Sequence, residues 1–201
     1  MSTLLRTLTL ATALATPLAA LAGPSLIVNG SFEADNIATG SWSIWSNLTG
    51  WTGAPNIELR DAVAGTAQDG SQYVELDTTA NSAMWQQVST TAGAHYTLSW
   101  FYSPRAGIAT ASNPIEVLWN DVLLTTNAGS GVGQSNHVWQ QYTFDVVGTG
   151  GLDKLTFRAV GTSDSLGGSL DHVDLRAVPE PSTLALLVAA AAGLALRRRR
   201  A

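Results

Sequence analysis

The sequence predicts an all-β protein whose central part folds as an antiparallel β-sandwich. Between Gly23 and Pro181, the apolar residues do not recur with the helical period of 3.6 residues. Short runs of alternating apolar and polar residues occur instead, and clusters of Gly, Asn, Ser and Asp separate them. About nine such runs in about 155 residues are typical of a sandwich or a barrel.

The expected strands follow one another with short connections. His95–Tyr102 is the clearest, because four large apolar residues alternate along it and share one face. Asn120-Asp121 separates two runs as a two-residue hairpin turn. The polar stretch Trp42–Asn56 is expected to be a loop. The other expected strands are Leu26–Val28, Ile57–Arg60, Gln72–Asp77, Met84–Val88, Ile115–Trp119, Val122–Thr125, Trp139–Val147, Asp153–Ala159 and Gly168–Ala177.

Several short segments, taken in order, resemble a known group of β-sandwiches. They read LIVNGSFEA (26–34), GW (50–51), YVELD (73–77), YTLSWFYSPRAG (96–107), IEVLWND (115–121) and DSLGGSLDHVDL (164–175). This series is similar to the galactose-binding-like jelly-roll modules, in particular to the DUF642-like group and neighbouring carbohydrate-binding modules. The resemblance covers nearly the whole central domain and implies a jelly roll with a structural calcium ion.

The C-terminal segment Val178–Ala201 has a composition of its own. Its prolines break regular structure, and the following stretch Ser182–Leu196 carries no charge. The segment closely resembles the PEP-CTERM sorting signal of bacterial exopolysaccharide producers. The residues that carry this resemblance are Pro179, Glu180, Pro181, Arg197, Arg198, Arg199 and Arg200.

This second resemblance implies a route and a processing partner. A membrane-embedded exosortase would recognise the Pro-Glu-Pro motif and remove the apolar helix and the basic tail. The protein would be anchored transiently in the inner membrane and would then reach the cell surface or the extracellular matrix. Two other interpretations stay open. Thr183–Leu196 spans about 20 Å as a helix, less than the roughly 30 Å of a bilayer core, so it also fits a core helix. The arginines also fit a permanent tail anchor.

The first 22 residues have the pattern of a secretory signal peptide. Arg6 is the only charged side chain before Glu33, and Leu8–Leu21 is apolar with interspersed threonines. Ala20-Leu21-Ala22 matches a small-residue cleavage motif, so we expect cleavage after Ala22. The predicted organisation is therefore a signal peptide (1–22), a β-sandwich domain (23–177) and a sorting signal (178–201).

Removing both signals leaves an acidic domain. Residues 23–181 contain all fifteen acidic residues but only five basic ones, a formal charge of −10 against −5 for the whole chain. Nucleic-acid binding needs a basic patch, so we exclude a nucleic-acid partner. The chain has no cysteine, which excludes disulfides and thiol catalysis.

Glu33 and Asp171 are the predicted calcium ligands. In the resembled family, the acidic residue after the opening Asn-Gly-x-Phe and the Asp of the closing strand often share a calcium ion. The alternation in Gly168–Ala177 agrees, because it places Asp171 on the same inward face as Val173, Leu175 and Ala177. An unpaired carboxylate is costly there, and a calcium ion would compensate it. The alternative is that Asp171 pairs with an amide or an arginine and that Glu33 is solvated.

Trp42, Trp45 and Arg105 are the predicted ligand-binding residues. The two tryptophans lie in a stretch rich in Ser, Thr, Gly and Asn, and sugar rings stack on exposed aromatic faces. The alternative is that both pack inside, as we expect for Trp51. A guanidinium on a proline-fixed turn can clamp a carboxylate or a pair of sugar hydroxyls. The alternative for Arg105 is a structural ion pair with an acidic residue such as Glu116.

No catalytic group is predicted. The three histidines lack zinc-site spacing, and neither a Gly-x-Ser-x-Gly elbow nor a phosphate loop occurs. The sequence therefore favours a non-enzymatic exported protein that binds carbohydrate. A structural matrix or adhesion protein without a small ligand is the alternative. A glycan-active enzyme, which needs two facing carboxylates, is the third hypothesis.

Overall fold

The computed structural model describes residues 23–179, and residues 23–178 form one compact unit. The predicted signal peptide and the predicted apolar helix with its arginine tail lie outside the described residues. Within residues 23–179, no helix has the length and apolar composition needed to cross a membrane. The strands are β1 (Trp42–Leu48), β2 (Trp51–Asp61), β3 (Gln72–Glu75), β4 (Ala83–Ser89), β5 (His95–Ser103), β6 (Ile115–Trp119), β7 (Val122–Asn127), β8 (Gln140–Val147), β9 (Leu152–Ala159) and β10 (Ser169–Ala177), with one 3-10 turn, η1 (Thr110–Ser112).

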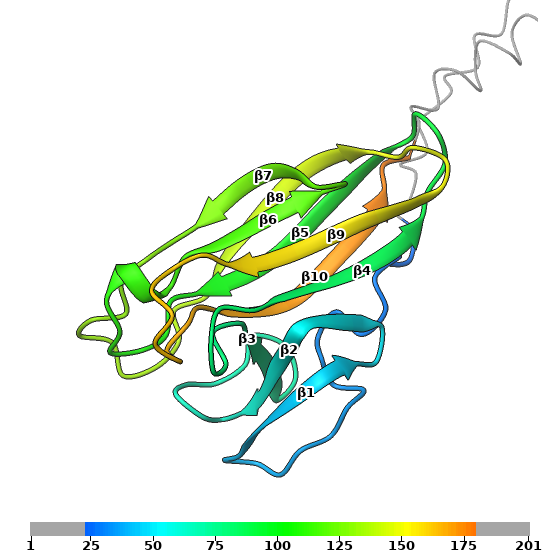
Figure 1. The fold of residues 1–201 in the computed structure, drawn as a ribbon. Coiled ribbons are helices and arrows are strands. Elements are labelled where there is room, and N and C mark those ends of the chain that lie inside the picture. Colours follow the sequence, from blue (N-terminus) through cyan, green and yellow to red (C-terminus); the bar gives the residue numbers. More distant parts are fainter. Residues whose placement is uncertain (1–22, 180–201) are drawn as a thin grey trace, which may run out of the picture. The chain divides into compact units, whose positions relative to one another are not determined.

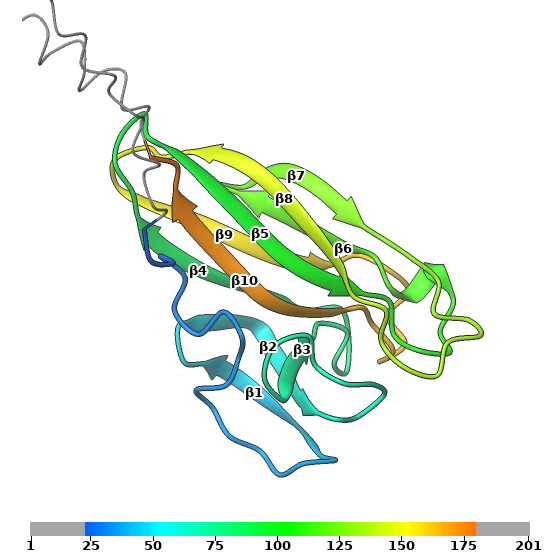
Figure 2. The same cartoon turned by 180° about the vertical axis from the view of Figure 1, so that it is seen from behind.

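The strands form one continuous antiparallel sheet that folds into two layers. Their order is β7-β6-β9-β4-β2-β3-β10-β5-β8, and β1 pairs with β2. Strand β2 belongs to both layers, because Thr52–Ala54 pairs with β4 whereas Glu58–Asp61 pairs with β3. Figure 1 shows β6, β9 and β4 in front, and Figure 2 shows β5, β8 and β10 from the opposite side. The predicted antiparallel β-sandwich of the jelly-roll type is confirmed.

The hydrophobic core lies between the two layers. The alternation predicted for β5 is confirmed, since Tyr96, Leu98, Trp100 and Tyr102 are at most 4% exposed and belong to the core. Strand β9 contributes Leu155 and Phe157 from the opposite layer. Burial of these large apolar side chains is the main favourable term for the fold.

The predicted turn at Asn120-Asp121 connects β6 and β7. Asn120 has φ 51° and Asp121 has φ 62°. Two consecutive positive φ values define a type I′ turn, which matches the twist of a tight hairpin. Asn and Asp tolerate this conformation better than other non-glycine residues, so the turn follows from its local sequence.

Two predictions at the N-terminal side, one of a strand and one of a loop, are wrong. Leu26–Val28 forms no strand, because the side-chain amide of Gln86 bonds both the N–H and the carbonyl of Val28 in place of a strand partner. Trp42–Asn56 is not a loop, because it forms β1 and the first half of β2. Strand β1 pairs only with β2, so it lies at an edge where polar residues are accepted.

A bulge in β10 corrects the predicted position of Asp171. The register against β5 shifts between Asp171 and Asp174, and His172 has φ 48°. Asp171 pairs with Phe101, on the face opposite to the core residues of β5. Its carboxylate is buried, as predicted, but under a loop rather than in the core. Ala177, also predicted to point inward, is exposed at the end of β10.

Candidate functional site

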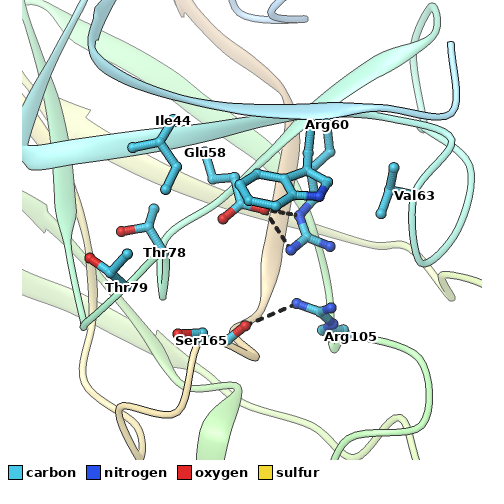
Figure 3. Close-up of a pocket in the computed structure, with 9 residues that line it drawn as sticks. Ile44, Glu58, Arg60, Val63, Thr78, Thr79, Arg105 and Ser165 are labelled. Atoms are coloured by element: carbon cyan, nitrogen blue, oxygen red, sulfur yellow. Dashed lines mark hydrogen bonds and ion pairs between the residues drawn. The ribbon is translucent and has the colours of Figure 1, made fainter. Parts of the chain in front are cut away.

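A pocket of about 310 Å³ opens on the outer face of the sheet, which points away from the core. It is formed by β1, β2 and the loops that follow β2, β3, β5 and β9. This volume is at the lower end of the roughly 300–1,000 Å³ of small-molecule sites. The lining residues, shown in Figure 3, are Trp42, Ile44, Glu58, Arg60, Val63, Thr78, Thr79, Arg105 and Ser165.

The register of β1 and β2 places apolar and charged side chains next to each other in this pocket. Trp42 pairs with Arg60, and Ile44 pairs with Glu58. Cross-strand partners point to the same face of a sheet, so all four side chains point toward the pocket. Trp42 is 54% exposed and Ile44 is 37% exposed. The pocket therefore has an exposed aromatic plane beside charged groups.

Four charged side chains form a network at the base of the pocket. Glu58 and Glu75 are direct partners across β2 and β3, an arrangement that destabilises a sheet unless cations lie between them. Arg60 supplies one cation, because its Nη2 lies 2.6 Å from Glu58 Oε1 and 3.0 Å from Glu75 Oε2. Arg105 supplies the other, with Nη1 2.9 Å from Glu75 Oε1. The buried Glu75 carboxylate thus holds both guanidinium groups in place.

Arg105 keeps donor groups without a protein partner. Arg60 is 4% exposed, and its buried guanidinium also interacts with the hydroxyl of its cross-strand partner Tyr73. Arg105 makes its side-chain hydrogen bonds within the described part of the chain through Nη1 alone, which leaves Nε and Nη2 free. A buried donor without a partner costs about 1–3 kcal/mol, and more when it is charged. The pocket therefore has a surplus of donors.

Burial changes the protonation of the two carboxyl groups. It raises the pKa of Glu75 to about 7, although Arg60, Arg105 and the Gly167 amide each act to lower it. Burial likewise raises the pKa of Glu58, against the lowering effect of the Arg60 guanidinium. The network therefore gains positive charge when Glu75 takes up a proton near neutral pH.

The loop after β9 is shaped by the buried Asp77 carboxylate. Asp77 Oδ2 accepts hydrogen bonds from the amides of residues 164–166 at 2.8, 2.8 and 3.3 Å. Within this turn Ser165 has φ 65°, and its carbonyl oxygen accepts a 3.2 Å bond from Arg105 Nη1. A Cβ at Gly167 would lie 2.7 Å from the Asp77 Cβ, so a glycine is required there. Asp77 thus positions one side of the pocket.

The structure places the three predicted ligand-binding residues differently. Trp42 and Arg105, 63 positions apart in the sequence, both line the pocket. Trp45 points to the other side of β1 and packs against the core, where its Nε1 is buried. The predicted structural pairing of Arg105 has a different partner, because Arg105 bonds Glu75 whereas Glu116 bonds Arg158.

The predicted calcium ligands Glu33 and Asp171 both hold the loop between β2 and β3. Glu33 Oε1 accepts hydrogen bonds from the amides of Ser71 and Gln72 at 2.8 and 2.6 Å. Asp171 Oδ2 accepts from residues 68 and 69 at 2.7 and 2.9 Å, and Oδ1 accepts from the His172 amide. Amide donors thus occupy both Asp171 oxygens, where a cation would need free lone pairs. Within residues 23–179, no three acidic or histidine side chains are grouped as a metal site. The calcium ion stays a prediction.

Sequence reasoning missed Arg60, Glu58 and Glu75. All three lie in segments that were predicted as strands, and no pattern in those segments gave them a role. One signal was present, because Arg60 is one of only five basic residues in the central domain and directly follows the apolar Leu59 in an expected strand. The loops that bury these side chains come from distant parts of the chain, which no local pattern indicates.

The C-terminal segment and the sandwich have separate relatives. Residues 177–200 match the PEP-CTERM protein-sorting motif. This match agrees with the resemblance seen in the sequence and overlaps the last residue of β10. The chain is also 30% identical over 155 residues to the multifunctional-autoprocessing repeats-in-toxin protein of Vibrio cholerae serotype O1. That match covers 75% of this chain but 3% of the relative, so the chain spans a small part of that protein.

Solved structures with a similar fold include a cyclase and carbohydrate-binding modules. The Stig cyclase Fisc from Fischerella sp. TAU is 15% identical with a TM-score of 0.57, and the match covers 79% of this chain and 99% of that chain. This likeness concerns the fold alone. A family 35 carbohydrate-binding module from Clostridium thermocellum is 18% identical with a TM-score of 0.46, over 68% of this chain and 98% of the module.

Proposed function

We propose that this chain is an exported, surface-directed protein whose sandwich domain binds carbohydrate without catalysis. The observation that carries the proposal is the exposed Trp42 indole in a pocket whose base is the Glu58–Arg60–Glu75–Arg105 network. An indole face provides stacking area for the apolar C–H surface of a sugar ring. The free arginine donors then reach the ring hydroxyls. In a structural protein without a small ligand, these unpaired donors would cost stability and nothing would compensate for them.

The binding test compares two tryptophans in the full chain, purified in detergent. We expect Trp42→Ala to abolish retention on a glycan array, because Trp42 provides the aromatic contact area of the pocket. Trp85→Ala is the matched control, since Trp85 lies on β4 outside the pocket beneath Lys154. Equal retention by the wild type and Trp42→Ala, or no retention of any glycan by the wild type, would refute the proposed site.

The proposal also includes processing by an exosortase at the Pro-Glu-Pro motif, which the PEP-CTERM match supports. The described domain continues to Val178, whose amide donates to the His95 carbonyl, so the motif follows the folded unit directly. We expect protein isolated from the cell surface to lack the apolar segment and the four arginines. Intact-mass measurement checks this expectation. Detection of Arg197–Arg200 in the final surface form would contradict it, as would normal surface delivery after replacement of residues 179–181 by alanine.

A further inference from the structure

We infer that the pocket selects an acidic sugar, a uronic acid residue whose carboxylate pairs with the free Nε and Nη2 donors of Arg105. The inference rests on the proposed carbohydrate function and adds the chemical class of the ligand. It is carried by Arg105, which lines the pocket and makes its side-chain hydrogen bonds within residues 23–179 through Nη1 alone.

The unpaired donors at the pocket favour a carboxylate as the acceptor group of the ligand. Arg105 keeps Nε and Nη2, which carry three N–H groups, for further bonds at the pocket. Figure 3 shows the Arg105 side chain at the pocket, bonded to Ser165. A carboxylate accepts from Nε and Nη2 of one guanidinium through two parallel hydrogen bonds, one to each oxygen. A neutral sugar hydroxyl satisfies fewer of these donors and forms weaker bonds, because it carries no charge.

The two guanidinium groups are fixed before the ligand arrives. Glu75 is 0% exposed, forms an ion pair with Arg60 Nη2 at 3.0 Å and accepts a hydrogen bond from Arg105 Nη1 at 2.9 Å. The Ser165 carbonyl, held by the turn around Asp77, fixes Arg105 from a second direction. Little side-chain freedom is therefore lost when a ligand binds, which favours affinity.

The rest of the pocket indicates a sugar ring rather than another carboxylate compound. Glu58 Oε1 accepts a hydrogen bond from Arg60 Nε and forms an ion pair with Arg60 Nη2, and its Oε2 has no partner within the described residues. That oxygen is available for a hydroxyl donor of the ligand. Trp42 and Ile44 supply the adjacent apolar surface. A uronic acid combines these three features, because it has a carboxylate, hydroxyl donors and an apolar ring face.

The charge of the domain limits the number of negative charges that a bound ligand can carry. Two arginines and two glutamates make the network formally neutral, whereas residues 23–181 carry −10. A long polyanion would be repelled by the rest of the domain, and salt screens that repulsion only beyond about 8–10 Å. The pocket therefore favours single or terminal uronic acid residues.

The test uses matched pairs of oligosaccharides with the full chain in detergent. Trimers of glucuronate, galacturonate and mannuronate are each compared with their methyl esters and with the neutral sugar of the same configuration. A chelator is present throughout, so that binding bridged by a cation is not counted. We expect at least one acid to bind about tenfold tighter than both its ester and its neutral counterpart.

Two variants assign the preference to the pocket. Arg105→Gln should abolish the preference for the acid, whereas Arg158→Gln should keep it. The substitution Arg158→Gln removes one positive charge, as Arg105→Gln does. It removes that charge from an ion pair with Glu116 that lies outside the pocket. Arg105→Gln can also disturb the buried Glu75. The comparison of acid and methyl ester on the wild-type protein therefore tests the preference for the acid without any variant.

The outcomes separate this inference from the proposed function. Equal affinity for acid, ester and neutral sugar would overturn the inference and leave carbohydrate binding intact. Binding of none of the sugars would overturn both. Loss of the acid preference in Arg158→Gln as well as in Arg105→Gln would assign the preference to surface charge and would also overturn the inference.

Discussion

The two faces of β2 and β3 are both buried, but by opposite means. On the core face, Leu59 and Val74 are cross-strand partners with 0% exposure and pack among apolar side chains. On the outer face, Glu58 and Glu75 are partners with 3% and 0% exposure and are paired with arginines. The same two strands thus carry an apolar layer on one face and an ionic layer on the other.

The difference teaches that burial and hydrophobicity are separate properties in this sandwich. The core face is buried by the opposite layer, which the chain's alternation encodes directly. The outer face is buried by the loops that carry Val63, Arg105 and Ser165, so charged residues there lose water and need partners. A buried ion pair is stable only while all of its partners are present.

The largest expected effect is the loss of Glu75. Glu75→Ala leaves Arg60 and Arg105 without their shared anion, so we expect the free energy of unfolding to fall by about 3–5 kcal/mol. Leu59→Ala, on the core face of the same sheet, should cost about 2–5 kcal/mol. Urea denaturation of both variants checks the comparison. A loss below about 1 kcal/mol for Glu75→Ala would mean that the outer face is effectively solvated.

The next prediction concerns pH and His137, which lies under the loops of the outer face. Burial lowers the pKa of His137 to about 4, while its bond to the Thr66 carbonyl acts in the opposite direction. The unfolded chain then binds a proton below about pH 6.5 that the folded chain does not bind. The contribution of His137 to stability should therefore fall as the pH falls from about 6.5 to 4, by about 3 kcal/mol, whereas Glu75 with its raised pKa contributes in the opposite direction.

The measurement is urea denaturation at several pH values, with His137→Asn as the reference. The difference in slope between the wild type and the variant isolates His137 from the other titrating groups. Identical slopes across this range would contradict the prediction, as would a His137 ring that titrates by NMR near pH 6.5.

A third prediction concerns the calcium ion expected from the sequence. If Glu33 and Asp171 bind calcium, a hundredfold excess over Kd should stabilise the domain by about 2.7 kcal/mol. Thermal melts with calcium and with chelator measure this, and Asp171→Asn should lose the response. Equal midpoints in both conditions would leave the bonds to the amides of residues 68–72 as the full role of these carboxylates.

The smallest effects separate the two tryptophans of β1. Trp45 packs against the core, so Trp45→Ala should lower the free energy of unfolding by about 2 kcal/mol. Trp42 is 54% exposed, so Trp42→Ala should change it by less than about 0.5 kcal/mol. Melting curves of both single variants are the measurement. Equal losses would mean that Trp42 is a packing residue, and the pocket would then lack its aromatic contact.

Local patterns were sufficient for much of this protein. Alternation identified the core residues of β5 and β9, and Asn120-Asp121 identified its own turn. These features depend on neighbours along the chain, which a sequence displays. The C-terminal motif was recognisable for the same reason, because residues 177–200 are contiguous.

The candidate site required the tertiary structure. Trp42 and Arg105 were selected from the sequence, but their meeting at one pocket depends on the pairing of β1 with β2 and on the loop after β5. Arg60 and Glu75 were not selected from the sequence, because nothing near them in the chain indicates the loops that cover them. The bulge in β10 likewise reversed the face of Asp171, since one extra residue inverts an alternation of period two. Side-chain periodicity is a local property, whereas burial of the opposite face depends on contacts between residues far apart in the sequence.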